Sequence, residues 1–267
     1  SNVVANMLFG AISGSGAAAA AAMGGTIGPM EKKEGYDPVY SAGVNIASAP
    51  TGMLIPPSNL MIVCSTIAGS VSVAALFTGG YVPGILWGLL VMFLAGVKAK
   101  KCGYVAERRI PAKMTGIITF MIGLSSIMSW VMAFTNIPEL VSAALLSFSS
   151  NKFVILFLIN IILLVVGTFM DMTPACLIFT PIFLPVCTAL GMDTIHFGIM
   201  MIFNLCIGTI TPPVGTTLFV GVKVGKVQIE TVFRQLLVYF AVIFAVLMLV
   251  TYIPNLSLWL PKLMGYI

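Results

Sequence analysis

One carboxylate stands inside a long apolar run of this sequence. Asp171 follows the mostly apolar residues 165–170 and lies three positions before Pro174. An ionised side chain is costly in such a segment and is usually functional. Carboxylate oxygens are also ligands that hard cations prefer. An alternative role is a helix N-cap, in which the carboxylate accepts backbone N–H groups, and the two roles are compatible. We therefore expect Asp171 to bind a cation at a break between two helices.

Hydroxyl groups stand beside glycines at three other places in the apolar runs. These residues are Ser13, Gly14, Ser15, Thr51, Gly52, Gly208, Thr209 and Thr211. At a broken helix, hydroxyls and freed backbone carbonyls together provide neutral oxygen ligands for Na⁺, while half-helix N-termini suit an anionic substrate. Each hydroxyl has an alternative, a hydrogen bond back to the carbonyl of the preceding helical turn. The matched positions of the whole set favour a cation site.

The breaks that hold these residues occur twice. Residues 51–58 and 207–214 each place a glycine and then a Pro-Pro pair inside an apolar run, and another break precedes each of them, around 13–15 and 169–171. A single offset of 156 residues relates Gly35 to Gly191 and Asp37 to Asp193, and it also relates Pro29, Gly52, Pro56 and Pro57 to Pro185, Gly208, Pro212 and Pro213. Such residues set backbone geometry. Two broken segments in corresponding positions of two halves indicate a transporter binding site near the bilayer midplane.

The composition is that of a membrane protein. The chain is 59% hydrophobic and only 8% charged, whereas soluble domains carry about 25% charged residues. The net charge of +5 does not indicate nucleic-acid binding, because the basic residues lie in short loops between apolar runs, where the positive-inside rule places them. The chain has no Ser/His/Asp set, no HExxH motif and no P-loop, so we expect no enzyme.

The apolar runs predict an all-α integral membrane protein with two re-entrant helical hairpins and two discontinuous helices. Residues 1–97 form a first inverted repeat, with a hairpin at 9–30, a broken helix at 39–65 and a span at 73–97. Residues 98–113 form a basic cytoplasmic loop. Residues 114–267 form the second repeat, with spans at 114–135 and 153–168, a hairpin at 169–190, a broken helix at 195–222 and a span at 236–260.

Counting crossings exposes a conflict in this topology. If the basic loop is cytoplasmic, the first hairpin enters from the inside and the second from the outside, so that the two copies are inverted. The two spans at 114–135 and 153–168 then return the chain to the wrong side before the second hairpin. Either the connector 136–152 crosses the membrane, for which it is too polar, or a segment is omitted near Lys113. We favour the omitted segment.

Further polar residues lie beside the breaks. They could line a substrate cavity or hydrogen-bond between helices, and the sequence does not separate these roles. These residues are Asn45, Ser48, Ser58, Asn59 and Asn204. His196, the single histidine, is interpreted as a cap or helix-interface residue rather than a proton relay. Four of the five cysteines lie in apolar runs without paired spacing, which is typical of small buried residues.

Several motifs together resemble a known family. Residues 9–17 (FGAISGSGA), 55–58 (IPPS), 167–172 (GTFMDM), 196–198 (HFG) and 211–215 (TPPVG) resemble the large membrane subunit, of DctM/SiaM type, of tripartite ATP-independent periplasmic (TRAP) transporters. The resemblance implies an ion-transporter fold with an elevator-type transport domain in a bacterial inner membrane. It also implies Na⁺-coupled import of an organic acid, either a sugar acid such as sialic acid or a dicarboxylate. A small membrane subunit and a periplasmic binding protein that delivers the substrate would be the partners, with no organic cofactor.

The resemblance also assigns site residues. A first Na⁺ site would comprise Ser13, Gly14, Ser15, Pro50, Thr51 and Gly52. A second would comprise Gly167, Asp171, Gly208, Thr209 and Thr211, with the substrate between the hairpin tips. The chain departs from the family because it lacks the helices that precede Phe9 there and the scaffold helices that follow the basic loop. The alternatives are a stand-alone cation-coupled anion transporter of the related superfamily and a structural membrane subunit without transport.

Overall fold

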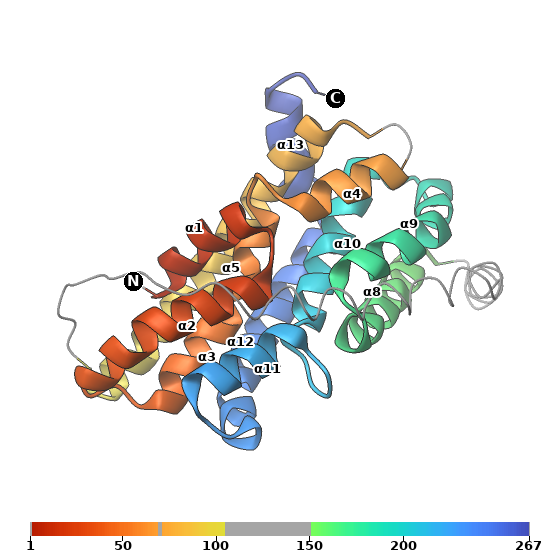
Figure 1. Ribbon diagram of the computed structural model, residues 1–267. Coiled ribbons are helices and arrows are strands. Elements are labelled where there is room, and N and C mark those ends of the chain that lie inside the picture. Colours follow the sequence, from red (N-terminus) through yellow and green to blue (C-terminus); the bar gives the residue numbers. More distant parts are fainter. Residues whose placement is uncertain (1, 69–70, 105–150, 267) are drawn as a thin grey trace.

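The computed structural model describes residues 2–68, 71–104 and 151–266, and Figure 1 shows their arrangement. Every element in these ranges is a helix, as predicted. The first half contains α1 (Asn2–Ser13), α2 (Gly16–Lys33), α3 (Pro38–Ser48), the 3-10 helix η1 (Ala49–Leu54), α4 (Asn59–Ile67) and α5 (Val73–Lys101). The second half contains α8 (Lys152–Phe169), α9 (Met172–Ala189), α10 (Thr194–Gly208), α11 (Thr216–Gly225), α12 (Ile229–Tyr252) and α13 (Asn255–Leu263). The predicted span at 114–135 lies outside the described residues.

The two halves repeat the same order of helices at the spacing found in the sequence. Asp37 and Asp193 cap α3 and α10, and each carboxylate accepts N–H groups of the first helical turn. The turn before each cap places a glycine in the left-handed region, Gly35 at φ +83° and Gly191 at φ +73°. Both Pro-Pro peptide bonds, Pro56–Pro57 and Pro212–Pro213, are cis. The offset of 156 residues therefore reflects a repeated backbone conformation.

Each half also ties its third helix to its fifth through an equivalent hydrogen bond. The hydroxyl of Tyr40 on α3 donates to the carbonyl of Ala95 on α5 over 2.8 Å. At the same offset, Nε2 of His196 on α10 lies 3.1 Å from the carbonyl oxygen of Thr251 on α12. Because a carbonyl accepts only, Nε2 of His196 carries the proton in this bond. His196 is a buried helix-interface residue, as the sequence indicated.

The two halves are interlocked rather than side by side. The helix α2 of the first half packs along α11 of the second, and α9 of the second packs along α4 of the first (Figure 1). The equivalent helices α5 and α12 run antiparallel. Lys98, near the end of α5, reaches Gln235 near the start of α12, and Gly79, near the start of α5, lies against the carbonyl of Ser257, just beyond α12. Antiparallel equivalents are what an inverted repeat requires.

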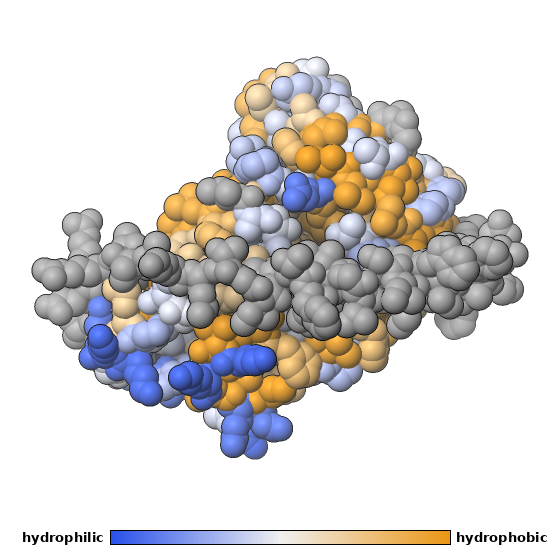
Figure 2. Space-filling view, in the orientation of Figure 1, coloured by the Kyte–Doolittle hydropathy of each residue, from blue (hydrophilic) through white to orange (hydrophobic). Residues whose placement is uncertain are grey.

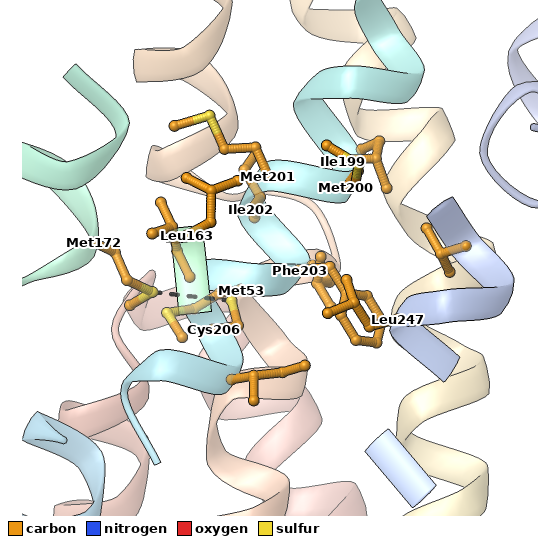
Figure 3. Close-up of a cluster of buried hydrophobic side chains, with 14 of the residues drawn as sticks. Met53, Leu163, Met172, Ile199, Met200, Met201, Ile202, Phe203, Cys206 and Leu247 are labelled. Carbon is orange, nitrogen blue, oxygen red and sulfur yellow. Dashed lines mark hydrogen bonds between the residues drawn. The ribbon is translucent and has the colours of Figure 1, made fainter. Parts of the chain in front are cut away.

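The core of the molecule surrounds α10. Every residue from Ile195 to Gly208 is buried, and Figure 3 shows its side chains directed toward several neighbouring helices. Phe203 of α10 packs against Trp87 of α5 with ring centroids 4.8 Å apart, which joins the two halves. Lipid tails are as apolar as leucine, so close packing of this kind, rather than escape from water, stabilises such a helix.

Four described helices, α5, α8, α9 and α12, are long and apolar enough to cross a membrane. The bent pair formed by α3–η1 and α4, with an angle of 47°, would be a fifth span if it is counted as one. Large apolar side chains point outward from these helices, for example Phe93 on α5, which is 67% exposed. Figure 2 shows hydrophobic residues over much of the visible surface of the described part. The chain is a multi-pass membrane protein.

Two predicted boundaries are wrong. The span predicted at 236–260 is two helices, because α12 ends at Tyr252 and Pro254, which has no N–H to donate, stands before α13. The basic loop predicted to begin at Lys98 begins at Cys102 instead, because α5 continues through Lys101. Lysines in the last turn of a helix interact favourably with its negative end.

The helix α8 holds in the second half the place that α1 holds in the first. It ends at Phe169, and two residues separate it from α9, as two residues separate α1 from α2. If α8 is the first arm of the second hairpin rather than a separate span, one crossing, predicted at 114–135, lies between the halves. That odd number satisfies the topology without an omitted segment. The hairpins themselves, and their orientation in a membrane, stay predictions.

Candidate functional site

Each half brings the end of its first helix against the break of its third through a glycine–glycine contact. A Cβ atom added to Gly52 in η1 would lie 2.4 Å from Cα of Gly10 on α1. A Cβ atom added to Gly208 at the end of α10 would lie 2.4 Å from the carbonyl carbon of Gly167 on α8. Real Cβ atoms do not approach other heavy atoms this closely, so only glycine permits these contacts. The first-helix ends and the helix breaks therefore meet.

The residues predicted for the first Na⁺ site lie on contacting elements. Ser13 is the last residue of α1, and Gly14 and Ser15 separate it from α2. Both helices pack against η1, which contains the other three predicted residues. The N–H of Gly16, the first residue of α2, points to the sulfur of Met53 in η1 at 3.2 Å. The structure thus places the two groups of predicted residues next to each other. Binding of Na⁺ there stays a prediction.

In the second half, Gly167 and Gly208 touch directly, and the start of α9 also lies at α10. Met172, which follows Asp171, has its sulfur 3.9 Å from Sγ of Cys206 on α10, the contact drawn as a dashed line in Figure 3. Asp171 is therefore the neighbour of a residue, Met172, that contacts the last turn of α10. Thr209 directly follows that turn.

Asp171 and Ser15 are equivalent residues with different bonding. Both are N-cap residues of the second hairpin arm, Ser15 of α2 and Asp171 of α9, at the offset of 156. The hydroxyl of Ser15 accepts the N–H of Ala18 over 3.3 Å. The carboxylate of Asp171 makes no such capping hydrogen bond, and its backbone partner is the adjacent amide of Met172. The second break thus holds a half-buried carboxylate that forms no ion pair with any described residue.

The hydroxyl groups of the threonines at the breaks all donate to backbone carbonyls three or four residues earlier in the chain. The acceptor is the carbonyl of Ser48 for Thr51, that of Cys206 for Thr209 over 2.8 Å, and that of Ile207 for Thr211 over 2.7 Å. This is the alternative that the sequence left open. It does not remove the cation role, because a hydroxyl that donates its hydrogen keeps two lone pairs.

Backbone bonds limit which oxygens are free at the second break. The carbonyl of Thr209 accepts the N–H groups of Thr217 and Leu218, the first residues of α11, over 3.0 and 3.2 Å. The carbonyl of Thr211 accepts the N–H of Gly215 over 3.1 Å. These two carbonyls therefore stabilise the start of α11, and the hydroxyl oxygens remain the better candidates for cation ligands at these threonines.

Three of the five predicted substrate-lining residues make interhelical hydrogen bonds. The amide nitrogen of Asn6 on α1 donates to Oδ1 of Asn45 and to Oγ of Ser48 on α3, both over 2.9 Å. The amide nitrogen of Asn204 on α10 donates to Oδ1 of Asn160 on α8 over 2.7 Å. The side chains that make these bonds, those of Asn6, Asn45, Ser48, Asn160 and Asn204, are all buried. Each half thus braces its first helix against its third with a buried amide pair.

The other two predicted lining residues adjoin the first break. Asn59 is exposed at the start of α4, and its side-chain amide would lie 3.0 Å from a Cβ atom on Gly14. Ser58 precedes it and is fully buried, yet its hydroxyl has no partner among the described residues. A buried hydroxyl without a partner costs free energy unless something satisfies it. A substrate role for these two residues stays a prediction.

We expect Asn204→Leu to lower the free energy of unfolding in detergent by about 1–2 kcal/mol. The change keeps the shape of the side chain but leaves Oδ1 of Asn160 without the donor that the Asn204 amide provides. Thermal unfolding followed by intrinsic fluorescence measures the effect. The matched control is Asn59→Leu at an exposed position, which should leave the unfolding temperature unchanged. Equal stability of the two variants would contradict a bracing role.

The sequence reasoning missed Asn6 and Asn160. Each is an amide inside an otherwise apolar helix, and that alone could have identified both, because intramembrane polar residues usually pair with one another. Thr217 was also missed. It is fully buried at the start of α11, and its hydroxyl, which has no hydrogen-bond partner among the described residues, would lie 2.9 Å from a Cβ on Gly16.

Known proteins resemble this chain over almost its whole length. A family model described as "Tripartite ATP-independent periplasmic transporter, DctM component" matches residues 1–111 and 110–256. A protein of Salmonella typhimurium named "Uncharacterized protein YgiK" is 43% identical over 98% of this chain and 75% of its own length. Two proteins of Vibrio cholerae are similar too. The C4-dicarboxylate TRAP transporter large permease protein DctM is 30% identical over 98% of this chain and 77% of its own length. The sialic acid TRAP transporter large permease protein SiaM is 29% identical over 99% of this chain and 78% of its own length.

These relatives contain residues that have no counterpart here. The alignment with the Salmonella protein runs over 327 positions, more than the 267 residues of this chain. The two segments that the family model matches overlap at Ile110–Pro111, two residues before Lys113, near which the sequence predicts an omitted segment.

Proposed function

This chain belongs to the DctM component family of tripartite ATP-independent periplasmic transporters, and we propose that it is the subunit that carries an organic acid across a bacterial inner membrane together with Na⁺. The observation that carries this proposal is the repeated contact between the last turns of a first helix and a helix break, at Gly10–Gly52 and again at Gly167–Gly208. Broken helices inside a membrane protein expose backbone and side-chain oxygens where coupling ions bind.

Two Na⁺ sites, one per half, are supported by the matched oxygens of the two junctions. The first offers neutral groups, the hydroxyls of Ser13, Ser15 and Thr51. The second adds the carboxylate of Asp171, which has neither a capping hydrogen bond nor an ion pair with any described residue. A bound cation would neutralise that carboxylate in an apolar setting, where an unpaired charge is costly.

An anionic substrate is supported by the placement of helix N-termini. The first residue of α2, Gly16, and the start of α11, at Thr217, lie against each other, so the positive ends of two helix dipoles meet there. Two of the relatives bear the names of transporters for C4-dicarboxylate and sialic acid. We propose a carboxylate-bearing substrate of this kind, sugar acid or dicarboxylate, delivered by a periplasmic binding protein. A small membrane subunit would complete the transporter.

We also propose that hairpins and broken helices move together, as an elevator mechanism requires. The glycine contacts and the buried amide pairs join α1 to α3–η1 and α8 to α10. Separating either pair would leave buried amides unpaired, which costs about 1–3 kcal/mol per group. Motion of each junction as one body avoids that cost.

The test is uptake of radiolabelled sialate and succinate into proteoliposomes that contain this chain with its small subunit. The expected result is accumulation of one acid that requires an inward Na⁺ gradient and the periplasmic binding protein. Uptake that persists with K⁺ in place of Na⁺ contradicts the coupling. Uptake without any binding protein favours the stand-alone anion transporter, and no uptake of any organic acid under all conditions favours the structural subunit.

A further inference from the structure

Cations gather at one end of the molecule, where α2, α5 and α11 end and α12 begins. Figure 2 shows most of the strongly hydrophilic visible residues along this lower edge, and Figure 1 places those helix ends there. The exposed cations in these segments are Lys32, Lys33, Lys100, Lys101, Lys223, Lys226 and Arg234. The one exposed carboxylate among the same segments is that of Glu230. By the positive-inside rule, we expect this end to be the cytoplasmic one.

At this end of the molecule, Lys98 of α5 lies against α12, and we call the line of contact between these two helices the α5–α12 seam. The ammonium group of Lys98 lies 4.7 Å from the ring centroid of Tyr239 and donates to the backbone carbonyl of Gln235 over 3.3 Å. Both partners belong to α12. No carboxylate of the described residues pairs with Lys98, so the fixed charge is not neutralised within the described part. The aromatic ring and carbonyl position the ammonium without cancelling its charge.

The same seam has unmet hydrogen-bonding capacity. Oε1 of Gln235 and the hydroxyl of Tyr239 are buried, and neither has a hydrogen-bond partner among the described residues. Arg234, next to Gln235, is exposed. One end of the α5–α12 seam therefore combines a half-buried lysine, an exposed arginine and two unsatisfied polar atoms.

The membrane-facing surface leads directly to this group of residues. On α5, Leu89, Phe93 and Val97 are 55%, 67% and 40% exposed, and their four-residue spacing places them on one face. On α12, Leu237 and Val238 are 50% and 45% exposed. Exposed apolar side chains thus come within one residue of Lys98 on α5 and within three residues of Arg234 on α12. The acyl chains of a phospholipid likewise end near its phosphate.

We propose that Lys98 and Arg234, at the cytoplasmic end of the contact between α5 and α12, bind the phosphate of an anionic phospholipid whose acyl chains lie against the exposed apolar side chains of these helices. The net positive charge of this end attracts anionic rather than zwitterionic headgroups, because each basic residue near a membrane surface adds a separate attraction to anionic lipid. Neither the Na⁺ sites nor the substrate site takes part, so this proposal does not depend on the proposed transport function.

The test is native mass spectrometry of the protein purified with its membrane partners, in detergent that contains equal amounts of phosphatidylglycerol and phosphatidylcholine. The expected result is preferential retention of phosphatidylglycerol by the wild type. Lys98→Met, which keeps the apolar stem of the side chain, should weaken phosphatidylglycerol binding about fivefold. Arg234→Met, a change at an exposed position, is the second variant and should act in the same direction. It keeps the test informative if Lys98→Met does not fold.

Two controls separate a site from general charge attraction and from phosphate binding. Lys262→Met changes a lysine of α13, beyond the other end of α12, and should leave lipid retention unchanged. Inorganic phosphate at about 50 mM, which gives an ionic strength roughly like the physiological one, should not displace the lipid. The reason is that the acyl chains also contribute to lipid binding. Equal retention of the two lipids, wild-type retention by both Met variants, or displacement by inorganic phosphate would each overturn the proposal.

Discussion

Asp171→Asn is expected to abolish Na⁺-driven uptake while the protein still inserts and folds. The substitution keeps the size and shape of the side chain but removes the charge from the second break. Asp171 makes no capping hydrogen bond there, and the asparagine side-chain oxygen can still accept the adjacent N–H of Met172. A coupling ion at this break would lose its only carboxylate oxygens among the residues predicted to hold it.

The measurements are the rate of Na⁺-driven uptake into proteoliposomes and the binding of Na⁺ to the purified protein. We expect the apparent Na⁺ affinity to fall at least about tenfold, which corresponds to about 1.4 kcal/mol. Glu230→Gln is the matched control, because Glu230 is an exposed carboxylate in the first turn of α12. An unchanged Na⁺ dependence in Asp171→Asn would refute the cation role of Asp171.

The two Na⁺ sites should also differ in strength. Ser15 holds the position in the first half that Asp171 holds in the second, and its hydroxyl already accepts an N–H group. The first site therefore has neutral ligands only, and we expect it to be the weaker one. Na⁺ titration of Asp171→Asn should then retain the weak site and lose the tight one.

Gly208→Ala is expected to have the largest effect on folding. The new Cβ atom would lie 2.4 Å from the carbonyl carbon and 2.5 Å from Cα of Gly167. Both are backbone atoms of α8, so no side chain can rotate away, and α8 must move from α10. Overpacking of this kind costs about 1–3 kcal/mol, and displacement of α8 would also strain the bond between Asn160 and Asn204.

Thermal unfolding in detergent and the yield of monodisperse protein measure this effect. Gly96→Ala is the matched control, since a Cβ atom at this α5 glycine meets nothing within 4 Å. It should be neutral or stabilising, because alanine favours a helix over glycine by about 1 kcal/mol. Gly52→Ala, which would clash with the backbone of Gly10, should resemble Gly208→Ala. Wild-type stability of both variants would mean that the Gly10–Gly52 and Gly167–Gly208 contacts leave room for a methyl group.

Much of this architecture could be read from the order of residues alone. The offset of 156 predicted that Gly35 and Asp37 are equivalent to Gly191 and Asp193, and in the structure these residues form equivalent turns and helix caps. These features are local, because a cap, a left-handed glycine and a Pro-Pro break depend on a few neighbouring residues. The composition likewise determined the membrane class, since an apolar chain with few charges has no polar surface for water.

The tertiary structure decided what the local pattern left open. The sequence could not tell whether Asn45 and Asn204 line a cavity or join helices, and their hydrogen bonds with Asn6 and Asn160 depend on residues 39 and 44 positions away. The role of 152–169 was also open. A long apolar helix is indistinguishable by hydropathy from a hairpin arm, and only its contact with α10 places α8 as the equivalent of α1.

The difference between the equivalent N-cap residues Ser15 and Asp171 depends on both the sequence and the tertiary structure. The sequence alone established that a carboxylate stands in the second copy where a hydroxyl stands in the first. Only the folded chain shows that the hydroxyl closes its helix cap while the carboxylate does not, since the backbone at Ser15 (φ −140°, ψ 122°) differs from that at Asp171 (φ −68°, ψ 155°). Residue types determined which groups are present, and the folded backbone determined which of them already have a hydrogen-bond partner.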